Sequence, residues 1–127
     1  MILRPTIAQN TEVEMKTKSQ IGKLSRNKGK VYERELAGNL REYGYDTHRG
    51  QQFCGKNGDA DVVGLPGIHI EAKRREQITI YDWMAQSISE AKQEESPVVM
   101  FRKSNCETLV VMRLPDFMDL YKKANKD

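Results

Sequence analysis

The stretch Asp61-Val-Val-Gly-Leu-Pro-Gly-Ile-His-Ile-Glu-Ala-Lys73 decides how this 127-residue chain folds. Two apolar runs flank a Leu-Pro-Gly segment, a pattern that predicts a β-hairpin with a three-residue loop. In the second run apolar residues alternate with polar ones, so Glu71 and Lys73 are expected on the same face of the sheet. The loop length would also place Val62 opposite Ile70 and Asp61 opposite Glu71. Because a slip of one residue would separate the two carboxylates, the prediction depends on this register.

A helix is predicted over residues 31–43, because the segment is rich in helix formers and is followed by Gly44. At about 100° per residue, one stripe of this helix collects the apolar side chains, and Glu33 falls within it. The stripe consists of Tyr32, Leu36, Ala37, Leu40 and Tyr43. Because a buried, unpaired carboxylate is costly, Glu33 needs an Arg or Lys, a backbone amide or a metal ion as its partner, unless it reaches solvent at the open end of the stripe.

The rest of the chain alternates between strand and helix patterns. Strands are predicted at 45–49, 97–101 and 108–113, and helices at 81–92 and 115–123. The 81–92 helix would bury Trp83, Met84, Ile88 and Ala91, and the glycine-containing segment 50–58 would be a loop. These elements predict a single α/β domain over residues 21–127, in which helices flank a mixed central β-sheet. A flexible basic extension is expected over residues 1–20.

Two acidic side chains that face each other in a hairpin point to a bound cation. Without one, Asp61 and Glu71 would repel each other at a Cβ separation of roughly 5 Å. Hard divalent ions prefer carboxylate and carbonyl oxygens, and Lys73 could orient an attacking water or stabilise charge on a phosphate. The pattern therefore indicates metal-assisted phosphodiester hydrolysis. The alternatives are an ordinary surface ion pair between Glu71 and Lys73, and Asp59 in the place of Asp61; His69, on the same face, is expected to be a packed or solvent-facing side chain.

The order of these motifs resembles a nuclease family. Similarity to the PD-(D/E)-x-K nucleases, and among them to the archaeal-type Holliday-junction resolvases, lies in Gly29-Lys-Val-Tyr-Glu-Arg-Glu-Leu36, Arg49, Asp61-Val-Val-Gly64 and Ile70-Glu-Ala-Lys73. The resemblance covers residues 24–113 and departs from the family pattern at Ala60, where a proline often stands. It implies a restriction-endonuclease-like core that uses Mg²⁺, which Mn²⁺ could replace.

The resemblance also implies a role for each matching residue. Glu33, Asp61 and Glu71 would organise the metal ion, with the backbone carbonyl of Ala72 as a further ligand. Lys73 would assist catalysis together with these three acids. Basic residues at two other matching positions, 34 and 49, would approach the DNA backbone.

Basic residues are concentrated before and around these motifs. The net charge is only +3, but residues 16–30 contain six Lys or Arg and no acid. Such a run suits a polyanion, although a solvated tail gives the same pattern. The residues expected to contact DNA are Lys23, Arg26, Lys28, Lys30, Arg34, Arg49, Arg74 and Arg75.

The composition excludes several other classes of protein. Apolar residues make up 38% and charged residues 31%, a globular balance, and no run approaches the roughly 20 apolar residues that span a bilayer. The N-terminus lacks the pattern of a secretory signal, and Cys54 and Cys106 form neither a C-x-x-C pair nor a disulfide framework. A cytoplasmic protein is therefore expected, encoded by a cellular or viral genome.

The sequence thus predicts a Mg²⁺-dependent, structure-specific endodeoxyribonuclease of DNA recombination or repair that acts on four-way junctions as a Holliday-junction resolvase. Two symmetric cuts would call for a homodimer, with the 81–92 helix, the final helix and the sheet edge as candidate contact surfaces. One alternative is another PD-(D/E)-x-K nuclease of nicking, repair or restriction type. The other is a non-catalytic DNA-binding relative.

Overall fold

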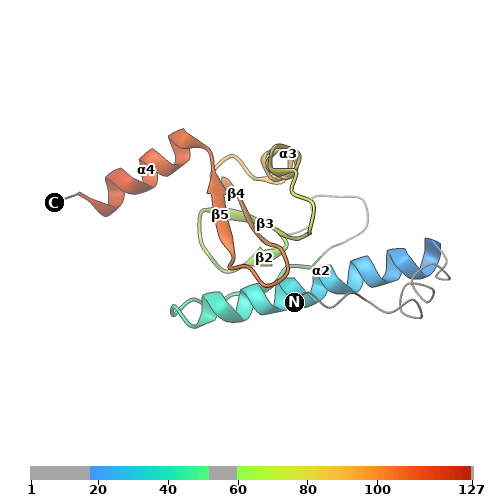
Figure 1. Cartoon of the computed structure of the whole chain (residues 1–127). Coiled ribbons are helices and arrows are strands. Elements are labelled where there is room, and N and C mark those ends of the chain that lie inside the picture. Colours follow the sequence, from blue (N-terminus) through green and yellow to red (C-terminus); the bar gives the residue numbers. More distant parts are fainter. Residues whose placement is uncertain (1–17, 52–59, 127) are drawn as a thin grey trace, which may run out of the picture.

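The computed structural model describes residues 18–51 and 60–126. Within them a helix is followed by three strands, a helix, two strands and a last helix (Figure 1). The elements are α2 (Lys18–Arg41), β1 (His48–Arg49), β2 (Val62–Val63), β3 (Ile68–Arg74), α3 (Ile80–Glu90), β4 (Ser96–Arg102), β5 (Leu109–Met112) and α4 (Leu114–Ala124). The α/β class and the order of the elements agree with the prediction.

The strands form one mixed sheet in the order β1-β2-β3-β4-β5. Neighbouring strands are antiparallel, except that β3 and β4 are parallel. A parallel pair needs a crossover connection, and α3 supplies it. Figure 1 shows α2 on one side of the sheet and α3 on the other, so the predicted sheet flanked by helices is confirmed.

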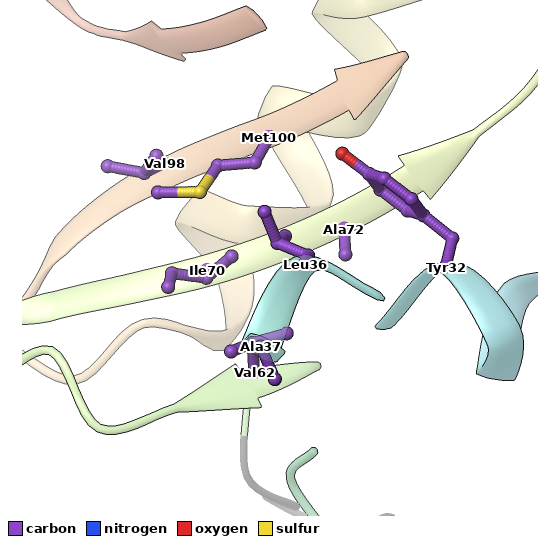
Figure 2. Packing of buried hydrophobic residues seen from close by; sticks show 8 residues of the cluster. All are labelled: Tyr32, Leu36, Ala37, Val62, Ile70, Ala72, Val98 and Met100. Atoms are coloured by element: carbon purple, nitrogen blue, oxygen red, sulfur yellow. The ribbon is translucent and has the colours of Figure 1, made fainter. Parts of the chain in front are cut away.

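Apolar side chains form one cluster on each face of the sheet. The cluster beneath α2 (Figure 2) consists of Tyr32, Leu36, Ala37, Val62, Ile70, Ala72, Val98 and Met100. The cluster beneath α3 consists of Trp83, Met84, Val99 and Phe101. Neighbouring residues of β4 belong to different clusters because successive strand side chains point to opposite faces. The predicted stripe of α2 packs against the sheet as far as Leu40, whereas Tyr43 lies beyond the helix and is 80% exposed.

The 61–73 hairpin has the predicted register. Val62 pairs with Ile70, and the Ile68 N–H donates to the Leu65 carbonyl oxygen at 3.1 Å, which closes the loop. The regular ladder ends at Val62, and the Asp61 N–H then donates to the Ile70 carbonyl oxygen at 3.0 Å. Asp61 is therefore held at the start of β2, where the strand gives way to a bend.

Gly64 allows the hairpin to approach the chain that enters β1. Its φ is +119°, and a Cβ at this position would meet the Asp46 carbonyl oxygen and lie 2.7 Å from the Thr47 Cα. Only glycine accepts both the positive φ and the close backbone. The Thr47 hydroxyl in turn donates to the Ala37 carbonyl oxygen at 2.7 Å, so α2, β1 and the hairpin corner are joined.

Helix α2 begins at Lys18, well before the predicted start at residue 31. The basic stretch contains good helix formers, and a single internal glycine costs a helix only about 1 kcal/mol, so Gly29 does not end it. The side chains of Lys23, Lys28 and Lys30 are exposed along this extra length. The structure therefore places part of the basic run on a helix.

Helix α3 buries Ser87, whereas the sequence pattern favours Ile88. Ile88 is 42% exposed, while Ser87 is fully buried and its hydroxyl bonds the carbonyl oxygens of His69 and Val98 at 3.3 and 3.2 Å. These two bonds attach α3 to neighbouring strands. The inner face of α3 thus packs against the chain's own sheet, so this face is not available for contact with a second subunit.

Helix α4 starts at Leu114, one residue before the predicted start at Pro115, and buries none of its residues. It extends away from the sheet in Figure 1, next to the edge strand β5. Among the helices in residues 18–51 and 60–126, none combines the length and the apolar character that crossing a membrane requires. Residues 1–17 of the expected extension lie outside the described part of the chain. Residues 52–59, which include Asp59 and most of the expected loop, lie outside it as well.

Candidate active site

One open pocket of about 330 Å³ brings together nine of the predicted site residues. They come from α2, β1, the start of β2, and β3 with the residue that follows it, and Gln86 of α3 lies in the same wall. The nine are Lys30, Glu33, Arg49, Asp61, Glu71, Ala72, Lys73, Arg74 and Arg75. Residues that are distant in the sequence therefore meet at one end of the hairpin.

Asp61 is fixed against the neighbouring strand. Its Oδ2 accepts a hydrogen bond from the Ala72 N–H at 2.9 Å. The N–H and C=O of a strand residue point to the same side, so the Ala72 carbonyl also faces the side on which Asp61 lies. The bond thus places a carboxylate and a backbone carbonyl next to each other.

Glu71 and Lys73 project from the face of β3 that α3 covers. Lys73 Nζ lies 3.4 Å from Glu71 Oε2. The Lys73 side chain is 17% exposed and the Glu71 side chain 3% exposed. Because Glu71 is buried, the interpretation as an ordinary surface ion pair is wrong. The predicted common face of the two residues is confirmed.

Glu33 has the arginine partner that its place in the apolar stripe requires. Arg49 Nε donates to Glu33 Oε1 at 2.8 Å, and the two side chains are 28% and 14% exposed. Arg49 reaches this position because β1 pairs with β2, with Arg49 opposite Val62. Arg49, expected at a DNA phosphate, therefore also holds a carboxylate of the pocket.

The three carboxyl groups have raised pKa values. Burial is the largest cause in each case. It raises the pKa of Glu33, although the hydrogen bond from Arg49 lowers it in part. It likewise raises the pKa of Asp61, although the Ala72 amide and Lys73 lower it in part. The pKa of Glu71 rises to about 8, because of burial and then the charge of Asp61, and Lys73 offsets only part of this. The pocket therefore favours a positive charge between these groups.

The donor set suits a hard divalent cation. Asp61, Glu71 and Glu33 offer carboxylate oxygens, and Ala72 offers a backbone carbonyl oxygen on the same side. Oxygen donors of this kind are the ligands that Mg²⁺ and Mn²⁺ accept, and a cation would also relieve the repulsion that raises the pKa of Glu71. The residues present thus fit the metal ion that the sequence predicts.

The basic residues divide between the pocket and the helix beyond it. Lys30 and Arg75 line the pocket with exposed side chains, and Arg74 lines it while its Nη2 donates to Ser104 Oγ at 2.9 Å. Three expected DNA contacts on α2 with described side chains do not line it: Lys23, Lys28 and Arg34. All three are exposed, and the Arg26 side chain lies outside the described part of the structure.

Glu90 is not among the residues predicted from the sequence, and His69 is predicted to be a packed or solvent-facing side chain. In the structure one ligand atom each of His69, Glu71 and Glu90 lies within 4.8 Å of the others. A signal for Glu90 exists, since it follows Trp83 and Ser87 at the i, i+4, i+7 spacing of one helix face. The position of His69 beside it depends on how α3 crosses the sheet.

The fold and the pocket define a PD-(D/E)-x-K protein, with a restriction-endonuclease-like sheet and the acidic residues and lysine of the motif at its hairpin. The chain belongs to the family described as "Phage putative PDDEXK endonuclease", whose model matches residues 24–127. Among solved structures it is similar to Hjc, a Holliday junction resolvase from the archaeal hyperthermophile Archaeoglobus fulgidus. The TM-score is 0.52 at 22% sequence identity, over 67% of this chain and 72% of that one. A search of curated proteins finds no match.

Proposed function

We propose that this protein is a divalent-metal-dependent endodeoxyribonuclease that cuts four-way DNA junctions. The metal ligands in this proposal are Glu33, Asp61, Glu71 and the Ala72 carbonyl oxygen. Lys73 is the catalytic lysine, which contacts the attacking water or the phosphate. Mg²⁺ is the expected ion, and Mn²⁺ is expected to replace it. The shape of a junction is a suitable target, because a single small domain that contacts phosphates reads geometry more readily than sequence.

The observation that carries the proposal is the meeting of acids from three separate elements beside one lysine. A buried Glu71 lies 3.4 Å from Lys73, and Asp61 and Glu33 line the same open pocket. Burial raises the pKa of all three carboxyl groups in this open pocket, and perturbed acids gathered in a cleft are typical of functional sites. Family membership as an endonuclease and the fold similarity to a resolvase support the same reading.

Each residue has a separate task in the proposed reaction. A bound Mg²⁺ supplies Lewis-acid stabilisation of the scissile phosphate. The ammonium of Lys73 holds the attacking water or the phosphate oxygen, and Glu71 keeps this ammonium in place through the 3.4 Å contact. Arg49 donates to Glu33 at 2.8 Å, which favours the ionised form of Glu33 against the effect of burial on its pKa. Asp61 remains oriented because the Ala72 amide occupies one of its oxygens.

Cleavage of purified DNA tests the proposal. A labelled four-way junction and a linear duplex of the same sequence are incubated with the protein and Mg²⁺ or Mn²⁺. Wild type is expected to cut the junction preferentially, and Lys73→Met to reduce the rate about 100-fold or more. The exposed Lys126→Met serves as the matched control and should cut like wild type. Full activity in Lys73→Met would refute the assigned site, and equal cutting of linear duplex would refute junction selectivity.

The second candidate function is another DNA nuclease with the same site, such as a nicking, repair or restriction enzyme. The family description, which names an endonuclease without a substrate, favours keeping it. Preference for nicked or linear DNA in the same assay would select it. A non-catalytic relative would instead bind the junction in a salt-dependent way and cut neither substrate.

The basic residues are proposed to hold the DNA backbone. Lys30, Arg74 and Arg75 border the pocket, and Lys23 and Lys28 extend the positive charge along α2. Replacing Lys28 and Lys30 by Ala should lower junction affinity and reduce the slope of log K against log salt by about 1 for each lost phosphate contact. An unchanged salt slope would remove α2 from the DNA-binding surface.

A homodimer is proposed to supply the second cut. Edge strand β5 and α4 leave Leu109, Val110, Leu114, Phe117 and Tyr121 exposed, and a groove lies between the two elements. A two-fold axis through this region would cover that apolar surface and leave both active sites open. Light scattering should give a dimer mass for wild type and for Lys122→Asp, and a monomer mass for Phe117→Asp. A monomeric wild type would refute the dimer.

A further inference from the structure

We propose that His69, Glu71 and Glu90 hold a second divalent cation beside the first, and that this position selects a transition metal such as Mn²⁺ over Mg²⁺. The inference deepens the proposed function and rests on it for the catalytic use of the second ion. The cation position itself is argued from the geometry of three side chains that α3 and β3 bring together.

The three side chains converge from two elements. His69 and Glu71 are two residues apart in β3, so both project from the face that α3 covers. Glu90 is the last residue of α3, which crosses this face on its way to β4. One ligand atom of each residue lies within 4.8 Å of the other two, a spacing that a single coordinated ion can join after small side-chain adjustments.

One ring nitrogen of the buried His69 imidazole, Nε2, faces this position without a hydrogen-bond partner among the described residues. His69 is 3% exposed. Glu90 Oε1 is the facing carboxylate, at 3.9 Å from Nε2, which is too long for a direct hydrogen bond. Because buried ring nitrogens normally have a partner, an ion between the two groups would satisfy both.

The other ring nitrogen is set up for a metal-bound imidazole. Glu95 Oε1 lies 3.6 Å from His69 Nδ1, and the Lys92 backbone N–H holds the same oxygen at 2.9 Å. The 3.6 Å separation is too long for a hydrogen bond, but the negative charge beside Nδ1 favours the tautomer that carries its proton there, which leaves the lone pair on Nε2. A carboxylate behind a ligating histidine is the usual arrangement at protein metal sites.

The charges around the position also call for a cation. Glu90 adds its charge to those of Asp61 and Glu71, and it raises the pKa of both. Lys73 is the cation that lowers the pKa of both acids. Glu71 would be shared between the two metal positions, as expected for ions a few Å apart in a two-metal nuclease site.

The ligand types determine which ion fits. Mg²⁺ takes oxygen donors, whereas transition-metal ions also accept imidazole. Zn²⁺, Fe²⁺ and Ni²⁺ favour imidazole most, and Mn²⁺ accepts it beside carboxylates. His69 and Glu90 also line an open pocket of about 280 Å³ on the side of the hairpin loop, which gives an ion a path to the position. The first position, built from oxygen donors, should accept Mg²⁺ and Mn²⁺ alike.

Metal binding to the full chain without an affinity tag tests the proposal. Titration calorimetry counts the Mn²⁺ and Mg²⁺ ions bound, and pulsed electron paramagnetic resonance detects ¹⁴N coupled to bound Mn²⁺. Wild type should bind two Mn²⁺, one of them with ¹⁴N coupling. His69→Leu should bind one Mn²⁺ without that coupling. Glu90→Gln, a change at a half-exposed side chain that leaves the core intact, should weaken the second ion about tenfold or more.

Two matched controls separate this site from the rest of the chain. His48→Leu removes the other histidine, which is exposed, and Glu94→Gln removes an exposed acid near the end of α3. Both should retain two Mn²⁺ and the ¹⁴N coupling. A single Mn²⁺ in wild type, or ¹⁴N coupling that survives in His69→Leu, would overturn the proposal. Two bound Mn²⁺ with ¹⁴N coupling but no DNA cleavage would refute the proposed function alone, and cleavage without this coupling would refute the second site alone.

Discussion

Replacing Glu71 by Gln should make the metal-free protein more stable at pH 8 while abolishing metal-dependent cleavage. The carboxyl group is buried, with 3% of its side chain exposed, and its pKa is about 8 compared with an ordinary value of 4.5. The folded chain therefore keeps a proton that the unfolded chain releases. Stability from this group is fully present below pH 4.5 and is lost as the pH rises toward 8.

The size of the effect follows from proton linkage. One proton bound only in the folded state lowers the free energy of unfolding by about 1.4 kcal/mol for each pH unit between the two pKa values. Between pH 5 and pH 8 the upper limit is about 4 kcal/mol, and sharing of the proton with Asp61 reduces the expected loss to about 3 kcal/mol. Glu71→Gln cannot ionise, so it should escape this loss and forfeit only the weak pairing with Lys73.

Urea unfolding in metal-free buffer, at half-unit steps from pH 5 to pH 8.5, measures the prediction. The difference between wild type and Glu71→Gln isolates this group from all others that titrate, and the exposed Glu94→Gln provides the control curve. Saturating Mn²⁺ should restore wild-type stability by about 2.7 kcal/mol for each site filled at 100 times its dissociation constant, with little effect on Glu71→Gln. A wild-type stability that stays level or rises toward pH 8 relative to Glu71→Gln would refute the reasoning.

Three further substitutions test single contacts by urea unfolding at pH 7. Arg49→Met leaves the half-buried Glu33 without its partner and should lower the free energy of unfolding by about 1–2 kcal/mol. The pKa of Glu33 should rise further. An unchanged free energy of unfolding would mean that solvent already weakens the pair. Gly64→Ala forces a Cβ toward the Asp46 carbonyl and should cost about 2 kcal/mol or more, and a neutral result would show that the corner can relax. Tyr32→Phe deletes a hydroxyl that bonds the segment before β5 at 2.9 Å and should cost about 1 kcal/mol.

Local periodicity was sufficient to predict the hairpin register and the inner face of α2. The two-residue alternation placed Glu71 with Lys73, and the loop length placed Val62 opposite Ile70, as the structure has them. The 3.6-residue period put Glu33 on the packed side of its helix. These features depend on residues that are close in the sequence, where the repeat of the backbone fixes which side chains share a face.

Contacts between distant elements could not be predicted in this way. The pairing of Arg49 with Glu33 depends on β1, a strand of two residues that carries almost no periodic signal. The approach of Glu90 to His69 depends on the angle at which α3 crosses a parallel strand pair, which packing determines and spacing does not. The sequence pattern does not predict the early start of α2, because helix propensity in a charged segment is a weak signal when no apolar stripe accompanies it.

The bond between Asp61 and the Ala72 amide has a consequence for the evolution of this family. Strand β2 has only two residues, and the carboxylate at its start fastens it to β3. Loss of the acid would therefore loosen the hairpin as well as the metal pocket. A descendant released from selection for DNA cleavage should retain Asp here, or Asn, which still accepts this bond, while Glu33 and Lys73 drift. An aspartate at this position alone would then be poor grounds for inferring an active enzyme.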